Sequence, residues 1–290
     1  MKKLRTRRHE VVLNRSVGGD SAITVVLTIF GIFMILPLYY TIIQALKPLD
    51  ELFYFPPRFY VVNPTFDNFR MLFNLMGDSW VPFSRYIFNT VLISVVGTFG
   101  NLIFSSLAAY ALAKIEFPGG KAIFWLIQKS LMIGGTVTGL VNFITLSWLG
   151  WIDTYAAVIV PAFASTLGLY LMKQFMESAV TTEILESARL DGASEFRTFW
   201  SIAMPMVKPA WLTLIIYAFQ GLWGQGSTNL IYSEQLKTLN YAIGQILSAG
   251  ITRTGASCAS TVIMMMVPII VFIVSQSNVI ETMGTSGMKD

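Results

Sequence analysis

Long uncharged, apolar stretches constrain this chain of 290 residues more than any other feature. Only 12% of its residues are charged and 54% are hydrophobic, whereas an average soluble domain carries about 25% charged residues. A helix needs about 20 apolar residues to cross the hydrocarbon core, and backbone groups in lipid must be hydrogen-bonded within the segment. We therefore predict an all-α polytopic membrane protein with six transmembrane helices, at residues 23–46, 86–113, 122–149, 155–172, 210–226 and 261–280.

The placement of lysine and arginine predicts the orientation. With a cytoplasmic N-terminus, thirteen of the twenty basic residues fall in cytoplasmic segments and six in outer ones. Because cytoplasmic segments are enriched in these residues, we expect both termini inside. The chain then divides into a basic cytoplasmic tail (1–22), one membrane domain (23–281) and a cytoplasmic C-terminal tail (282–290). The membrane domain includes an outer loop at 47–85 and a cytoplasmic loop at 173–208.

Composition excludes most chemistry. One histidine and one cysteine leave no cysteine or histidine metal site and no histidine-based catalytic triad. None of the acidic residues lies inside the six spans, which argues against a secondary transporter, because such proteins usually keep an embedded ionisable group. The nearest approach to a phosphate loop, at 119–122, lacks the upstream glycine and the Ser/Thr after lysine. We expect no catalytic residue, no metal and no cofactor on this chain, and no nucleic-acid partner.

The cytoplasmic loop 173–208 has the pattern of a helical hairpin. Thr182 is a predicted N-cap and Gly192 a predicted left-handed helix end. Ser194 is expected to cap a second helix that ends before Pro205. Each helix has an apolar face, formed by Ile184, Leu185 and Ala188 in the first and by Phe196, Phe199 and Trp200 in the second. A hairpin that lies on the membrane surface explains this pattern equally well.

The residues of this hairpin resemble a known family. Glu186, Ser187, Ala188, Asp191, Gly192 and Ala193, followed by Pro205, are similar to the EAA loop of ATP-binding-cassette (ABC) importer permeases. Ser187 replaces the usual second alanine and is equally small. In that family the loop forms a coupling helix that seats in a groove of the cytoplasmic ATPase subunit. The resemblance therefore implies that these six residues contact an ATPase.

The resemblance extends over nearly the whole chain. Outer-loop motifs at 46–48, 51–53 and 65–69, the segment 108–113 and the tail 286–290 are similar to the second permease subunit of maltose-type sugar importers. This implies a bacterial cytoplasmic membrane protein that works with a homologous second permease, two ATPase subunits that bind ATP and Mg, and an extracytoplasmic sugar-binding protein. It also implies that Gly287 and Lys289 contact the ATPase. The chain has Trp223-Gly224 where the subgroup usually has Trp-Asn.

Two of the predicted spans supply candidate residues for a translocation path. The third predicted span is rich in small and polar residues, so it could line a path or pack closely through its Gly135-x-x-x-Gly139 pattern. Aromatic residues in and after the fifth span could stack on a sugar, although core packing or an interfacial belt explains them as well. The candidate path residues are Asn142, Trp211, Tyr217, Gln220 and Trp223.

The sequence leaves the solute open. The outer-loop motifs favour a sugar or oligosaccharide without identifying it. One alternative is an ABC permease for another solute, such as a polyol, glycerol phosphate or an oligosaccharide acid. The other alternative is a secondary transporter that works alone.

Overall fold

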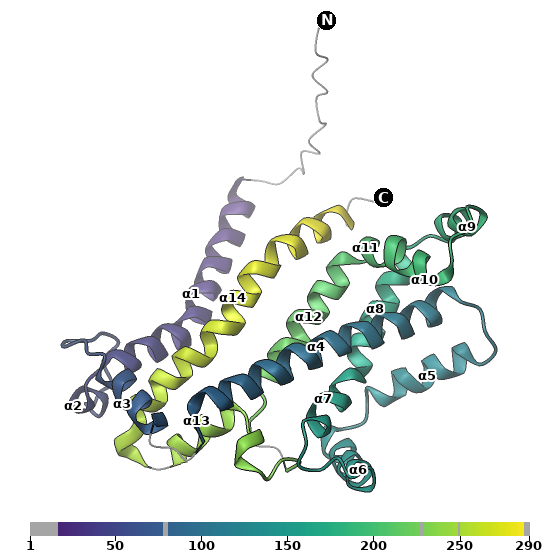
Figure 1. Ribbon diagram of the computed structural model, residues 1–290. Coiled ribbons are helices and arrows are strands. Elements are labelled where there is room, and N and C mark those ends of the chain that lie inside the picture. Colours follow the sequence, from purple (N-terminus) through teal and green to yellow (C-terminus); the bar gives the residue numbers. More distant parts are fainter. Residues whose placement is uncertain (1–16, 78–80, 227–228, 249, 287–290) are drawn as a thin grey trace, which may run out of the picture.

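The computed structural model describes residues 17–286 except 78–80, 227–228 and 249. Within these residues the secondary structure is helical, with no strand. The helices, shown in Figure 1, are α1 (Val17–Leu46), α2 (Leu49–Leu52), α3 (Asp67–Gly77), α4 (Phe83–Lys114), α5 (Gly120–Ser130), α6 (Gly135–Trp148), α7 (Ala156–Phe163), α8 (Thr166–Ala179), α9 (Thr182–Leu190), α10 (Glu195–Thr198), η1 (Phe199–Ala203), α11 (Met204–Met206), α12 (Lys208–Trp223), η2 (Glu234–Leu236), α13 (Leu239–Ser248), η3 (Ile251–Arg253) and α14 (Thr254–Ser286).

Helix α4 is the centre of the fold and packs against α7, α8 and α12. Its buried face consists mostly of small or polar residues, and these let neighbouring helices approach closely. A Cβ on Gly97 would lie 2.5 Å from Leu222 Cδ1, and one on Gly100 would overlap the ring of Phe163. A side chain at Gly100 would therefore displace the Phe163 ring, whereas one at Gly97 would require the end of the Leu222 side chain to shift.

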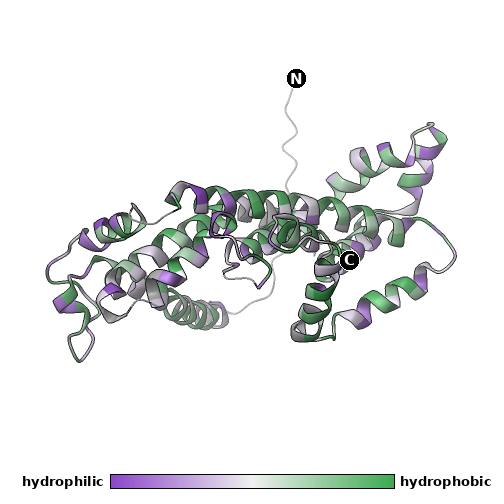
Figure 2. Ribbon diagram, turned by 60° about the horizontal axis from the view of Figure 1, so that its bottom comes forward, coloured by the Kyte–Doolittle hydropathy of each residue, from purple (hydrophilic) through white to green (hydrophobic). Residues whose placement is uncertain are grey.

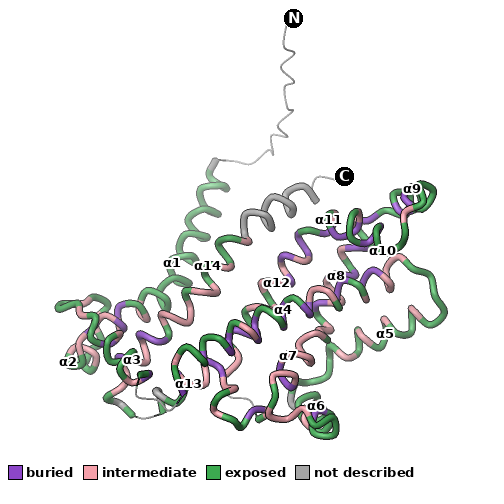
Figure 3. Tube along the Cα trace, in the orientation of Figure 1, coloured by how far each residue is buried: buried purple, intermediate pink, exposed green. Residues whose placement is uncertain are grey.

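Helices α1 and α14 lie side by side, with α3 packed against the lower part of both in Figure 1. A core around Ala45, Leu72 and Ala256 joins these three helices. Residues 18–38 of α1 are exposed on every side, as Figure 3 shows in green. This apolar segment stays largely exposed within the described chain, so in a membrane it would face lipid or another subunit.

Four helical segments are long and apolar enough to cross a membrane: Gly18–Leu46, Phe83–Lys114, Ala156–Ala179 and Thr254–Ser275. A fifth candidate is the pair Glu195–Met206 and Lys208–Trp223, which is bent by 83°. Figure 2 shows hydrophobic ribbon along the long helices and hydrophilic segments mainly at their ends and in the loops. The described residues thus contain four or five candidate spans, against the six predicted.

The continuous third span predicted at 122–149 is wrong. The structure has two shorter helices there, α5 and α6, separated at residues 131–134. Gly134 is extended, with ψ of 144°, and two consecutive glycines weaken a helix because they lose the most backbone entropy on ordering. A Cβ placed on Gly135 or Gly139 would have no other atom within 4 Å, so the close packing considered for them does not occur within the described part of this chain.

The fourth predicted span, 155–172, corresponds to α7 and α8, which are interrupted at Ala164 and Ser165. The Ser165 hydroxyl caps α8 by accepting a hydrogen bond from Gly168 N (3.0 Å). The Asn101 side-chain amide donates to the carbonyl of Ala162 (2.6 Å). A side chain of α4 thus satisfies a carbonyl that the interruption would leave without a helical partner.

The loop between α12 and α13 is held by Asp153, which precedes α7. Asp153 has a positive φ of 63°, and its carboxylate accepts hydrogen bonds from the backbone N–H groups of Tyr232 (2.9 Å) and Ser233 (2.8 Å) and from the Ser233 hydroxyl. The hydrogen bonds from Ser233, the largest cause, lower the pKa of Asp153 below its ordinary value. The attachment therefore depends on an ionised carboxylate.

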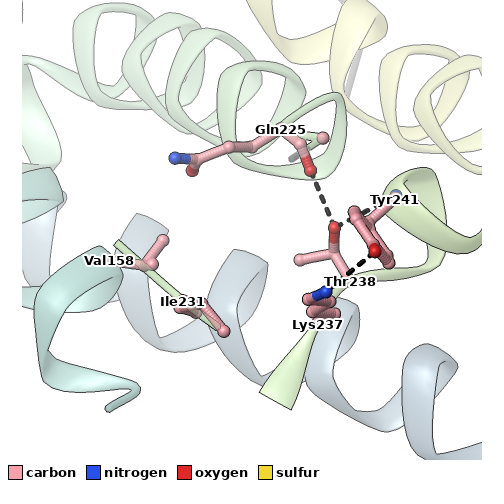
Figure 4. Close-up of a pocket in the computed structure, with 7 residues that line it drawn as sticks. Val158, Gln225, Ile231, Lys237, Thr238 and Tyr241 are labelled. Atoms are coloured by element: carbon pink, nitrogen blue, oxygen red, sulfur yellow. Dashed lines mark hydrogen bonds between the residues drawn. The ribbon is translucent and has the colours of Figure 1, made fainter. Parts of the chain in front are cut away.

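The same loop is also hydrogen-bonded to the chain at the end of α12. Thr238 Oγ1 donates to the Gln225 carbonyl (3.0 Å), and Lys237 Nζ bonds the Tyr241 hydroxyl (2.8 Å). Figure 4 shows these groups around a cavity of about 10 Å³. This volume holds about one water molecule, so the loop packs tightly against the end of α12 and leaves no room for a solute.

We expect Asp153→Ala to loosen residues 229–238, with roughly tenfold faster amide exchange at Tyr232 and Ser233, since two backbone donors lose a charged acceptor. Because the pKa of Asp153 is lowered in the folded state, its contribution is complete above the ordinary value of 3.8 and is lost as pH falls through the lower folded value. Hydrogen–deuterium exchange at pH 7 checks this, with Asp67→Ala as control. Unchanged exchange in Asp153→Ala contradicts the prediction.

Candidate functional site

Helix α9 begins the hairpin that the sequence predicts. Its N-cap is Thr181, in an extended conformation, so the prediction of Thr182 is wrong by one residue. Glu183 lies in the first turn, where its own backbone N–H, and next the Thr181 hydroxyl, lower its pKa. A negative charge at this position also suits the positive end of the helix.

The end of α9 confirms the predicted left-handed glycine. Gly192 has a φ of +80°. Its N–H donates to the Arg189 carbonyl (3.0 Å), while the N–H of Ala193 donates to the Ala188 carbonyl (3.0 Å). These two bonds form a Schellman motif, which satisfies carbonyls at the helix end. The Ser194 hydroxyl then caps α10 by accepting from Arg197 N (3.4 Å), also as predicted.

The second half of the hairpin continues further than predicted. Instead of ending before Pro205, the chain forms the π-helix η1 and then α11, which contains that proline. Pro205 directly follows the π-helix η1, near the end of the helical run Glu195–Met206, and it has no backbone N–H to donate there. The chain then turns by 83° into α12, so a sharp bend joins the hairpin to this helix.

The inward face of the hairpin belongs to the main hydrophobic core. Leu185 and Phe199 are buried there together with residues of α4, α8 and α12, and Ala188 is also buried, three residues after Leu185 on α9. The rings of Tyr110 and Phe199 are 5.4 Å apart in an edge-on arrangement. The hairpin is therefore packed onto the ends of the membrane helices. Among the six residues that resemble the EAA loop, Ala188 lies on this inward face.

Arg189 and Glu195 form an ion pair across the turn between α9 and α10, with 2.7 Å between Nε and Oε1. The Tyr110 hydroxyl of α4 donates to the other oxygen of Glu195 (3.0 Å). The hydrogen bond with Glu195 is the main cause that raises the pKa of Arg189. Sequence reasoning missed this link. The opposite charges on either side of Gly192 were a signal for the ion pair, but no sequence signal pointed to Tyr110.

The outward face carries most of the other candidate residues. Glu186, Ser187, Asp191 and Gly192 are exposed and Ala193 is half-buried. Leu190 lies between them and is 89% exposed. An apolar side chain so fully exposed at a helix end is available for a contact with another surface.

The candidate path residues do not converge. Trp211 Nε1 donates to the Met204 carbonyl (3.1 Å), and Trp223 Nε1 to the Met264 carbonyl (3.0 Å). The two indoles are separated along α12 by about 18 Å at a rise of about 1.5 Å per residue. Tyr217 and Gln220 are exposed on α12.

Asn142 lies on α6, whereas the extensive contacts of α12 are with α4, α8 and α14. The five residues thus do not share one site. Gly287 and Lys289 lie outside the described residues. Within the described part of the chain, no group of three or more His, Cys, Asp or Glu residues is placed to hold a metal ion.

The hairpin lies at one end of the molecule. In Figure 1, α9, the first turn of α1 and the last turns of α14 are at the upper side, while α2, α3, α6 and α13 are at the lower side. One surface of the fold therefore carries the hairpin and the ends of the first and last helices.

An apolar helical fold with a hairpin packed onto the ends of its long helices defines a membrane component. The sequence profile of the family described as "binding-protein-dependent transport system inner membrane component" matches residues 21–283. The chain belongs to this family.

Named relatives are permeases. The arabinooligosaccharides transport system permease protein AraQ of Bacillus subtilis (strain 168) is 28% identical over 273 residues, covering 92% of this chain and 95% of AraQ. The sn-glycerol-3-phosphate transport system permease protein UgpE of Yersinia enterocolitica is 30% identical over 202 residues, covering 69% of this chain and 72% of UgpE.

A solved structure shares the fold. It belongs to a bacterial ABC transporter involved in the import of the acidic polysaccharide alginate, with a TM-score of 0.75 and 21% identity. The match covers 91% of this chain and 99% of that chain. By its family and its named relatives, the protein is an ABC importer permease of the inner membrane.

Proposed function

We propose that this chain is a permease subunit of an ABC importer that takes up a sugar or oligosaccharide delivered by an extracytoplasmic binding protein. In this proposal α9 is the coupling helix, and Glu186, Ser187, Asp191, Gly192 and Ala193 lie at the contact with an ATPase subunit. Ala188 supports the contact from inside the hairpin.

The observation that carries the proposal is the two-sided hairpin. Its outward face exposes Leu190 beside acidic residues, and its inward side joins α4 through the Arg189–Glu195–Tyr110 link. Side chains that are packed or hydrogen-bonded to one another carry a displacement from one helix to the next. Force applied to α9 would therefore reach α4, around which α7, α8 and α12 are packed.

The remaining parts of the assembly follow from the same proposal. ATP and Mg bind to two ATPase subunits, and this chain hydrolyses no ATP itself. A homologous second permease covers apolar surface that is exposed here, including α1 and the glycine face of α6. The N- and C-termini are cytoplasmic, on the side of α9, and Gly287 and Lys289 contact the ATPase.

The relatives support the solute class without identifying the solute. AraQ is named for arabinooligosaccharides, which favours a sugar. UgpE is named for sn-glycerol-3-phosphate, which makes a phosphorylated polyol the second candidate.

We expect this chain to co-purify with an ATPase subunit when expressed with the other transporter subunits, and to show no ATP turnover when purified alone, because it lacks a phosphate loop. ATP hydrolysis by the purified complex in nanodiscs, with and without the loaded binding protein, measures this. ATP turnover by the pure chain would contradict the assignment of roles, and ion-coupled uptake by the chain alone would indicate a secondary transporter.

A further inference from the structure

A cavity of about 210 Å³ lies on the side of the molecule opposite α9, between α3, α4, η2 and α13. Its apolar and aromatic lining comes from Leu75, Met76, Phe83, Tyr86 and Ala242. Its polar lining comes from Glu234, Gln245 and Arg253. This volume is below the roughly 300–1,000 Å³ of pockets that enclose drug-sized ligands, so the cavity has room for a single ring-sized group and not for a chain of several rings.

The charges in this cavity are not balanced. The Glu234 carboxylate is already occupied, since it accepts from the Tyr86 hydroxyl (2.8 Å) and pairs with Lys237 Nζ (2.8 Å). Arg253 is half-buried, and among the described residues its guanidinium forms no ion pair or side-chain hydrogen bond. The cavity therefore presents one uncompensated positive charge.

The lining matches a saccharide ring in its other properties. Binding pockets for small molecules are largely apolar, with a few polar groups that fix orientation. Here Phe83 and Tyr86 supply aromatic surface for the C–H face of a ring, and Gln245 supplies an exposed amide for hydroxyl groups. The guanidinium of Arg253 has the planar geometry that binds a carboxylate or phosphate through two parallel hydrogen bonds.

We propose that this cavity binds one saccharide unit that carries a negative charge, with its carboxylate or phosphate on Arg253. The inference rests on the proposed function, because it places a selective contact on the outer side of the permease where a binding protein would deliver the solute. In this proposal Arg253 makes the cavity select negatively charged sugars over neutral ones.

The test uses the complete transporter complex in nanodiscs of zwitterionic lipid, so that no lipid headgroup supplies a net negative charge. Binding of D-glucuronate, D-glucose 6-phosphate and neutral D-glucose is measured by saturation-transfer NMR titration. We expect both anionic sugars to bind at least tenfold more tightly than glucose, and Arg253→Gln to remove this preference. The matched control is Arg70→Gln on α3, whose side chain is 81% exposed and lies outside the cavity.

Equal binding of the three sugars, no binding of either anionic sugar, or an equal loss in Arg70→Gln would overturn this inference. A preference for glucuronate alone or for glucose 6-phosphate alone supports it and identifies the anion. ATP hydrolysis stimulated by the binding protein is recorded on the same samples. Stimulation without anionic-sugar binding rejects this inference only, whereas a complex without ATP hydrolysis rejects the proposed function.

Discussion

Gly192→Val is expected to lower uptake and binding-protein-stimulated ATP hydrolysis at least tenfold while the chain still inserts in the membrane. Gly192 has a φ of +80°, where any residue with a Cβ costs about 1 kcal/mol or more and a β-branched residue fits worst. The Schellman hydrogen bonds of Gly192 and Ala193 are each worth about 1 kcal/mol. Losing this turn separates α9 from α10 and disrupts the Arg189–Glu195 pair.

The matched control is Gly192→Asn, because asparagine adopts the left-handed conformation more readily than other residues with a Cβ. We expect it to retain most of the activity. Membrane insertion is measured by fractionation, and complex formation by co-purification of the ATPase. If Gly192→Val transports normally, the turn does not hold a coupling surface. If Gly192→Asn fails as completely as valine, the left-handed geometry is not the cause.

The long spans were predictable from the sequence because hydropathy over about 20 residues is a strong signal. Helices α1, α4 and α14 and the α7–α8 segment correspond to predicted spans. The third span failed because residues 131–134 are apolar or glycine, so a hydropathy window continues across a backbone break. The only local signal of this break was the pair Gly134-Gly135, which weakens a helix without changing its hydrophobicity.

The hairpin was predictable where local chemistry decides it. The glycine end and the Ser194 cap depend on residues within one turn, and both were predicted. The inward position of Ala188 and the contact of Tyr110 with Glu195 depend on how α4 meets the hairpin, 85 residues away in the sequence. The hydrogen bonds of the Trp211 and Trp223 indoles were not predictable either, because their carbonyl acceptors lie on other elements. The role of these two residues in a translocation path stays a prediction.

Leu190→Arg is expected to weaken the association of the permease with its ATPase about 30-fold, or about 2 kcal/mol, the size of an interface hot spot. Leu190 is 89% exposed, so its replacement should change the stability of the chain by only about 0.5 kcal/mol. If its side chain enters an apolar groove of the ATPase, arginine introduces a buried charge without a partner, which is costly.

Leu190→Met is the matched control, because methionine keeps a similar volume and stays apolar; its affinity should remain within about threefold of the original, or about 0.6 kcal/mol. Phe196→Arg distinguishes a hairpin that contacts the ATPase from a hairpin that lies on the membrane surface. Phe196 is 66% exposed and would enter lipid in that arrangement. The affinity of the detergent-solubilised permease for the ATPase is measured by biolayer interferometry. Unchanged affinity in Leu190→Arg, combined with a loss of lipid contact in Phe196→Arg, would show that the hairpin rests on the bilayer and that the ATPase binds elsewhere.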